Sequence, residues 1–258
     1  MVDWQSPKEI ESDESTFKYL MHVLLGVYIW EWLTSLAFDW EYMSRKRPFR
    51  WPLIFYFLNR YSLLFALSAT PIALNVKRSI NCKALYTFLQ VCGSSSIGFS
   101  SINLSLRTMA IYGQSLYVVI ALVILILGHW CLLLHGLMLD AVWQPSHGCV
   151  IKETNLHILA ASFIYGMSFD FIVLILMAWK LVLSSRHGLP RTSRPALMTL
   201  VFSDGLFYFV VAFLSSLVAT ILVLLNLNAV MSVIASAPAA TASTIVACRV
   251  VRRLAMFS

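Results

Sequence analysis

The amino-acid sequence predicts an all-α membrane protein, a bundle of seven transmembrane helices with an outer amino terminus and a cytosolic carboxyl terminus. Three observations support this prediction. Only 12% of the 258 residues are charged, which is about half the fraction found in soluble domains. The hydrophobic residues, 59% of the chain, fall into runs of about 20 to 28 residues, long enough to cross a bilayer as helices. The basic residues gather at the span ends of one side, as cytosolic connections do in most membrane proteins.

The seven predicted spans follow one another with short connections. They cover residues 17–38, 51–74, 84–111, 116–139, 157–183, 196–225 and 229–251. Each is expected to be a helix, because backbone polar groups in lipid must pair within their own segment. The chain thus divides into a polar, acidic amino-terminal segment at 1–16, a transmembrane domain at 17–251 and a short basic cytosolic tail at 252–258.

The spans differ in composition, and these differences indicate how each one packs. The first follows the acidic segment, and the second opens with Trp51 and Pro52 directly after a basic turn. The third is rich in small residues, which let helix backbones approach closely. A tight turn separates it from the fourth, and a basic loop joins the fifth to the sixth. The seventh contains Pro238, which predicts a kink in that helix.

The orientation follows from the distribution of positive charge. The connection after the first span carries Arg45, Lys46, Arg47 and Arg50, and such a cluster is expected on the cytosolic side. The net charge of +7 does not indicate nucleic-acid binding, because the basic residues lie at span ends rather than along one face. The expected environment is therefore a lipid bilayer, either the plasma membrane or the endoplasmic reticulum.

Charged residues within the predicted spans are the main candidates for a ligand site or a polar network, because charge in a bilayer is costly. They are Glu31, Arg60, Arg107, Asp170 and Asp204. We expect at least one pair of opposite charge to meet, above all Glu31 with Arg60, since consecutive antiparallel spans are usually neighbours. Such a pair either fixes helix packing alone or acts as a switch or a proton-handling group.

Asp170 stands out because it lies near the middle of the fifth span without a charged partner at the same depth. It would face a water-filled cavity or remain protonated, and it is the best single candidate for a ligand or catalytic contact. His129 and His135 are too far apart to form a metal-binding pair, so no metal site is expected. No cofactor is expected either, because phosphate-binding and dinucleotide-binding motifs are absent from the sequence.

The five cysteines contain one candidate disulfide. Cys82 precedes the third span and Cys149 lies between the fourth and fifth, so both are predicted on the oxidising outer side, where a bridge is allowed. The alternative is two free thiols. Cys92, Cys131 and Cys248 are interpreted as small apolar residues within spans.

Several stretches together resemble one family, a large group of seven-span membrane proteins of unknown function from mushroom-forming (basidiomycete) fungi. They are WEWLTSLAFDWEYMSRKRPFRWPLIFYFLNRY at 30–61, LRTMAIYGQS at 106–115, SDGLFYFVVAFLSSL at 203–217 and CRVVRRL at 248–254. The chain departs from the family pattern at Glu31, where aspartate is typical, and at Ser203, where arginine is typical. The resemblance implies a receptor-like bundle with its amino terminus outside and assigns no reaction.

Two functional hypotheses follow. The first is a receptor-like protein that binds an apolar small molecule among the third, fifth, sixth and seventh spans. The alternative is an intramembrane enzyme, of cyclase or isomerase type, that acts on a lipid or terpenoid substrate. In that case Glu31, Asp170 and Asp204 would be the candidate general acids. A transporter is less favoured, because no internal repeat is evident in the sequence.

Overall fold

The computed structural model describes residues 6–44, 46, 49–75, 81–136, 140–144, 148–153, 156–186, 194–225 and 229–257. Helices dominate these ranges. They are α1 (Pro7–Thr34), α2 (Leu36–Met43), α3 (Leu53–Asn75), α4 (Cys82–Ile111), α5 (Leu116–His135), α6 (Leu156–Arg186), α7 (Arg194–Leu225), α8 (Ala229–Ile234) and α9 (Ser236–Phe257). A β-hairpin of β1 (Asp140–Gln144) and β2 (Gly148–Glu153) lies between α5 and α6.

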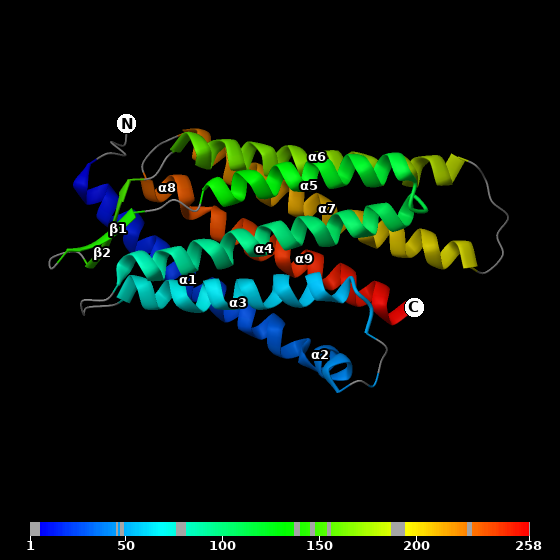
Figure 1. Ribbon diagram of the computed structural model, residues 1–258, viewed down its shortest axis with the longest axis horizontal. Coiled ribbons are helices and arrows are strands. Elements are labelled where there is room, and N and C mark those ends of the chain that lie inside the picture. Colours follow the sequence, from blue (N-terminus) through cyan, green and yellow to red (C-terminus); the bar gives the residue numbers. More distant parts are fainter. Residues whose placement is uncertain are drawn as a thin grey trace.

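The helices form an elongated bundle, and successive long helices run in opposite directions along its axis (Figure 1). The amino terminus lies at one end and the carboxyl terminus at the other (Figure 1). Two passes are broken. The axes of α1 and α2 differ by 49° across Ser35, and a short α8 precedes α9.

Length and composition mark several of these helices as candidate membrane spans. Within the described residues, five helices are long and apolar enough to cross a membrane, and the bent pair of α1 and α2 would be a sixth. This is the composition of a multi-pass membrane protein. The prediction of seven spans is thus confirmed only in part, and the orientation of the termini stays a prediction.

The helix that falls short of this composition is α4, although its 30 residues exceed the length needed for a span. It packs against α3, α9, α5 and α6, so other helices cover much of its surface. Its buried side chains include Ser96, Ser100, Asn103 and Thr108. Polar residues are tolerated here because neighbouring helices, rather than lipid, surround them. The low hydropathy of α4 therefore reflects its central place in the bundle.

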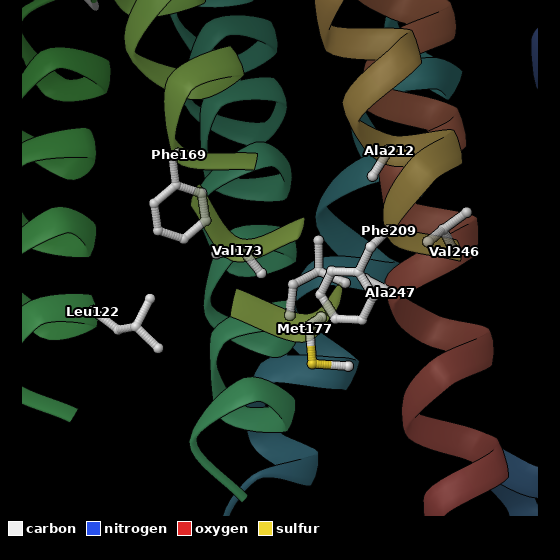
Figure 2. Packing of buried hydrophobic residues seen from close by; sticks show 9 residues of the cluster. Leu122, Phe169, Val173, Met177, Phe209, Ala212, Val246 and Ala247 are labelled. Carbon is white, nitrogen blue, oxygen red and sulfur yellow. The ribbon is translucent and has the colours of Figure 1, made fainter. Parts of the chain in front are cut away.

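The largest apolar cluster joins α4, α5, α6, α7 and α9. Its buried members are Leu104, Leu122, Phe169, Val173, Met177, Phe209, Ala212, Val246 and Ala247, and Figure 2 shows how these side chains meet. Many large apolar side chains, among them Ile124, Leu127 and Trp179, are instead exposed on the outer faces. Apolar surface on the outside as well as in the core fits contact with a lipid bilayer.

Helix α1 begins at Pro7, ahead of the first predicted span, so part of the acidic segment is helical. Its start has a physical cause. The hydroxyl of Ser6 accepts a hydrogen bond from the backbone N–H of Glu9 at 3.4 Å, and Pro7 occupies the first helical position. Both features favour a helix amino terminus, and the negative charge of Glu9 in the first turn adds to them.

The hairpin is a second addition to the predicted picture, because the sequence indicated only a loop at this place. In its antiparallel register, Trp143 pairs with Cys149 and Val142 with Val150. Strand β1 also lies against α4. The hairpin therefore lies at the end of the bundle where α4 begins (Figure 1).

Candidate functional site

A buried ion pair between α2 and α3 is the most enclosed charged contact described. Arg60 Nε lies 3.0 Å from Asp39 Oδ2, and the two side chains are 3% and 0% exposed. The prediction that Arg60 pairs with Glu31 is therefore wrong. The break at Ser35 starts a new helix, and α2 carries Asp39 to the guanidinium. Asp39 is not among the candidates predicted from the sequence, because the predicted first span ends one residue earlier.

Further hydrogen bonds fix the Arg60 guanidinium at the break between α1 and α2. It donates to Ser35 Oγ, to Tyr56 Oη at 3.0 Å and to the carbonyl oxygen of Trp32 at 2.6 Å. The last carbonyls of a helix lack donors within the helix, so Arg60 supplies one where α1 ends. The guanidinium also lies 5.8 Å from the Trp32 ring centre and 5.9 Å from that of Tyr56, within cation–π range.

Two tyrosines complete this cluster. Tyr56 Oη donates to Asp39 Oδ1 at 2.9 Å, so both carboxylate oxygens of Asp39 have partners. Tyr28 Oη donates to the carbonyl oxygen of Arg60 at 2.8 Å and joins α1 to α3. Arg60 Nε and Asp39 Oδ2 meet only as an ion pair, without a hydrogen bond, and their opposite charges make the burial of both groups tolerable. The cluster therefore fixes the shape of the bent first pass.

Glu31 has different partners, both on the last helix. Its carboxylate accepts hydrogen bonds from Arg249 Nε at 3.1 Å and from Arg252 Nη2 at 2.5 Å, with a further bond from Arg249 Nη2. The side chain of Arg249 is 49% exposed, whereas those of Glu31 and Arg252 are mostly buried. This contact, the α1–α9 clamp, lies toward the end of the bundle that carries the carboxyl terminus (Figure 1).

A third polar group lies where α3, α4 and α9 meet. Ser96 Oγ is 3.3 Å from Asn59 Oδ1 and 2.9 Å from Thr244 Oγ1, and Thr244 Oγ1 is 3.1 Å from Asn59 Oδ1. One turn further along α4, Ser100 Oγ lies 2.8 Å from Ser243 Oγ. The sequence showed these small polar residues but not which of them would meet.

Asp170 on α6 is buried and faces α7. Ser216 Oγ donates a hydrogen bond of 2.5 Å to Asp170 Oδ2. The partner that the sequence did not reveal is thus a hydroxyl from a different span. One turn along α7, Thr220 Oγ1 donates to the carbonyl oxygen of Phe163 on α6. Hydrogen bonds therefore join these two helices beside the large apolar cluster.

The remaining candidates lie elsewhere. Arg107 is buried on α4, and its guanidinium lies 5.8 Å from the centre of the Phe209 ring on α7. Asp204 also belongs to α7, but its side chain is outside the described part of the chain. The four predicted site residues with described side chains, Glu31, Arg60, Arg107 and Asp170, therefore do not form one site. Glu31 contacts α9, Arg60 contacts α1 and α2, and Asp170 contacts α7.

His129 is a buried polar residue that the sequence analysis set aside. Its Nδ1 lies 3.3 Å from Ser101 Oγ, and its ring packs near those of Tyr165 and Phe169. Within the described residues, no group of three histidine, cysteine or acidic side chains could hold a metal ion. His129 is thus held by a neighbouring hydroxyl and by aromatic packing.

The cysteines are described in part. Cys82 is buried at the start of α4, and Cys92, Cys131 and Cys248 are free thiols. The side chain of Cys149 lies outside the described part of the chain, although its backbone belongs to β2. The pairing of Cys82 with Cys149 therefore stays a prediction.

Comparison with known proteins adds no relative. No family model matches the chain, and no curated protein matches it. The function is therefore inferred from the polar groups described above.

Proposed function

We propose that this chain is a seven-span, receptor-like membrane protein that binds an apolar small molecule within its helix bundle. The five apolar helices and the bent pair of α1 and α2 supply six passes. We assign the seventh to α4, which is long enough to span a bilayer and is surrounded by other helices. The proposal includes an outer amino terminus, a cytosolic carboxyl terminus and membership of the fungal family that the sequence resembles.

The observation that carries ligand binding is the buried carboxylate of Asp170. Binding sites for small molecules are mostly apolar, with a few polar groups that orient the ligand. Asp170 lies beside Phe169 of the large apolar cluster and accepts one hydrogen bond from Ser216. A carboxylate can accept about four hydrogen bonds. Asp170 therefore retains the capacity to bind a hydroxyl or amine of an otherwise apolar ligand.

The α1–α9 clamp supports the receptor-like part of the proposal. A ligand shifts a conformational equilibrium only through contacts that differ between two states. Glu31 joins the first and last helices through two arginines, one of them half exposed. Opening of this contact can begin at Arg249, the half-exposed arginine, because water can solvate its guanidinium once it leaves Glu31. Opening of the clamp would free α9 at the proposed cytosolic end.

The test uses thermal unfolding of the purified protein in lipid. Fractions of an apolar extract, containing lipids and terpenoids, are added one at a time. A ligand that binds only the folded state raises the unfolding temperature, so at least one fraction should raise it for the wild type. Asp170→Asn should reduce this increase, while Glu11→Gln, in an exposed position near the start of α1, should leave it unchanged. If every fraction acts equally on wild type and Asp170→Asn, Asp170 does not contact the ligand.

The enzyme hypothesis remains as a second candidate, favoured by the same contact between Asp170 and Ser216. A carboxyl group held in an apolar interior can act as a general acid. Glu31 binds two arginines, which favour its charged form, so it is a poor general acid. The enzyme hypothesis therefore depends on Asp170, and the side chain of Asp204 lies outside the described part of the chain. Lipid and terpenoid extracts from cells with and without the gene distinguish the two readings. An accumulated precursor and a missing product would favour the enzyme, and unchanged extracts would favour the receptor.

A further inference from the structure

Asn59, Ser96 and Thr244 form a closed triangle of polar atoms, fully buried where three helices meet. Each side chain comes from a different helix: Asn59 from α3, Ser96 from α4 and Thr244 from α9. The three oxygen–oxygen distances are 3.3, 2.9 and 3.1 Å. All three are short enough for hydrogen bonding.

The triangle does not satisfy the Asn59 amide. Its oxygen is placed to accept from both hydroxyls, whereas its Nδ2 is buried without a hydrogen-bond partner in the described part of the protein. Exchanging the amide oxygen and nitrogen would direct Nδ2 toward the hydroxyls and leave the oxygen unpaired instead. One polar atom of Asn59 therefore lacks a protein partner in either orientation. Buried polar groups of this kind usually bind an internal water.

With the amide oxygen toward the two hydroxyls, the triangle is also short of hydrogens. Each hydroxyl has one hydrogen to donate. If Ser96 and Thr244 both donate to Asn59, no hydrogen remains for the 2.9 Å contact between them. If one of them donates to the other, Asn59 loses a donor. A small molecule that can both donate and accept hydrogen bonds would supply the missing partner of these three side chains.

The neighbouring part of α4 has the same character. Ser96, Ser100 and Asn103 follow one another at spacings of four and three, so they lie on one face of the helix. Asn103 Nδ2 donates to the carbonyl oxygen of Phe55, but Asn103 Oδ1 is buried without a partner among the described residues. The interior of the bundle therefore holds two incompletely paired amides, Asn103 on this face of α4 and Asn59 on α3.

We propose that an internal water molecule binds at Asn59, between α3, α4 and α9, and hydrogen-bonds to the amide atom that the protein leaves unpaired. Water fits because the site is neutral and needs a small molecule that can donate and accept. The next residue in the sequence, Arg60, is charged, but its side chain forms the ion pair with Asp39. The water would make the contacts of α9 with α3 and α4 exchangeable, since a water-mediated contact can re-form with different partners. This inference does not depend on the proposed ligand site at Asp170.

A high-resolution density map of the full chain in lipid provides the direct test. We expect a solvent peak at about 2.7–3.2 Å from the Asn59 amide, the usual hydrogen-bond range. The peak should be absent in Asn59→Leu and should persist in Asn75→Leu, since the Asn75 amide bonds within its own helix. A wild-type map that resolves other internal waters but shows no peak at Asn59 would overturn the proposal.

Thermal unfolding gives an independent result and includes a variant of nearly unchanged shape. Thr244→Val removes a hydroxyl while keeping the branched side chain. With water bound, Asn59→Leu and Thr244→Val should each lower the unfolding temperature by several degrees, because each breaks a satisfied network. At a dry site, Asn59→Leu would remove an unpaired polar group and raise the temperature. That increase would contradict the proposal. If Asn59→Leu does not fold, the test of the bound water relies on two measurements: the unfolding temperature of Thr244→Val and the density map of the wild type.

Discussion

At the residue scale, the buried polar side chains differ in how much the fold depends on them. Arg60 and Asp39 form an ion pair that is almost fully buried, whereas Glu31 shares its carboxylate with a half-exposed arginine. Removing one member of a buried ion pair leaves a charge without compensation, which costs about 3–5 kcal/mol. A partly exposed pair contributes no more than about 1 kcal/mol. The two contacts should therefore respond very differently to substitution.

The first prediction is that Asp39→Ala lowers the free energy of unfolding by about 3–5 kcal/mol, whereas Arg249→Ala, which removes the half-exposed partner of Glu31 and leaves Arg252 in place, lowers it by about 1 kcal/mol. A double-mutant cycle identifies the partners. Arg60→Ala should show strong coupling with Asp39→Ala and weak coupling with Glu31→Ala, measured from unfolding in lipid. Equal coupling of Arg60 to both carboxylates would contradict the geometry described here.

At the element scale, close approach of α4 to α5 depends on a missing side chain. A Cβ atom added at Gly98 would lie 2.6 Å from the Trp130 ring, which itself packs against Phe99. At Gly93, on the same helix, an added Cβ would meet nothing within 4 Å. Small residues in membrane helices therefore have distinct roles, and only those at a contact set the distance between helices.

The second prediction compares these two glycines. Gly98→Ala should lower the free energy of unfolding by about 1–3 kcal/mol, because the Trp130 ring must move away from its neighbours. Gly93→Ala should be neutral or stabilising by up to about 1 kcal/mol, since alanine favours the helix and meets no obstacle. Thermal unfolding of the two variants measures both effects. A destabilised Gly93→Ala beside an unchanged Gly98→Ala would reject the packing of α4 on α5.

The third prediction concerns the start of α4 and the hairpin. Cys82 and Cys149 should react with a thiol reagent only after reduction of the unfolded protein, because we expect them to be bridged. The free thiols of Cys92, Cys131 and Cys248 should react without reductant and serve as internal controls. Peptide mass analysis identifies the labelled sites. Labelling of Cys149 before reduction would rule out the bridge.

At the scale of the whole molecule, the number of spans decides whether the two termini lie on the same side of the membrane or on opposite sides. The described helices include five candidate spans, or six with the bent pair of α1 and α2, and α4 would make seven. An odd number places the termini on opposite sides, as they lie at opposite ends of the bundle (Figure 1). The apolar outer faces fit a bilayer around this bundle.

The fourth prediction tests that topology with an epitope tag at each terminus. In intact cells that carry the protein at the surface, an antibody should reach the amino-terminal tag. It should reach the carboxyl-terminal tag only after the membrane is permeabilised. If the protein remains internal, protease protection of sealed vesicles gives the same comparison. If both tags are found on the same side of the membrane, the protein does not have seven spans, and six candidate spans, with α1 and α2 counted as one, would be the number that crosses.

The long helices and the multi-pass character could be predicted from the amino-acid sequence, because both depend on local runs of apolar residues and on the need to pair backbone groups in lipid. The sequence also identified charged residues in the bundle. The tertiary structure decided their partners. Arg60 pairs with Asp39 because the chain bends at Ser35, and the partner of Asp170 is a serine on another helix. Such contacts depend on how each helix is rotated about its axis and packed against others, which local sequence does not specify.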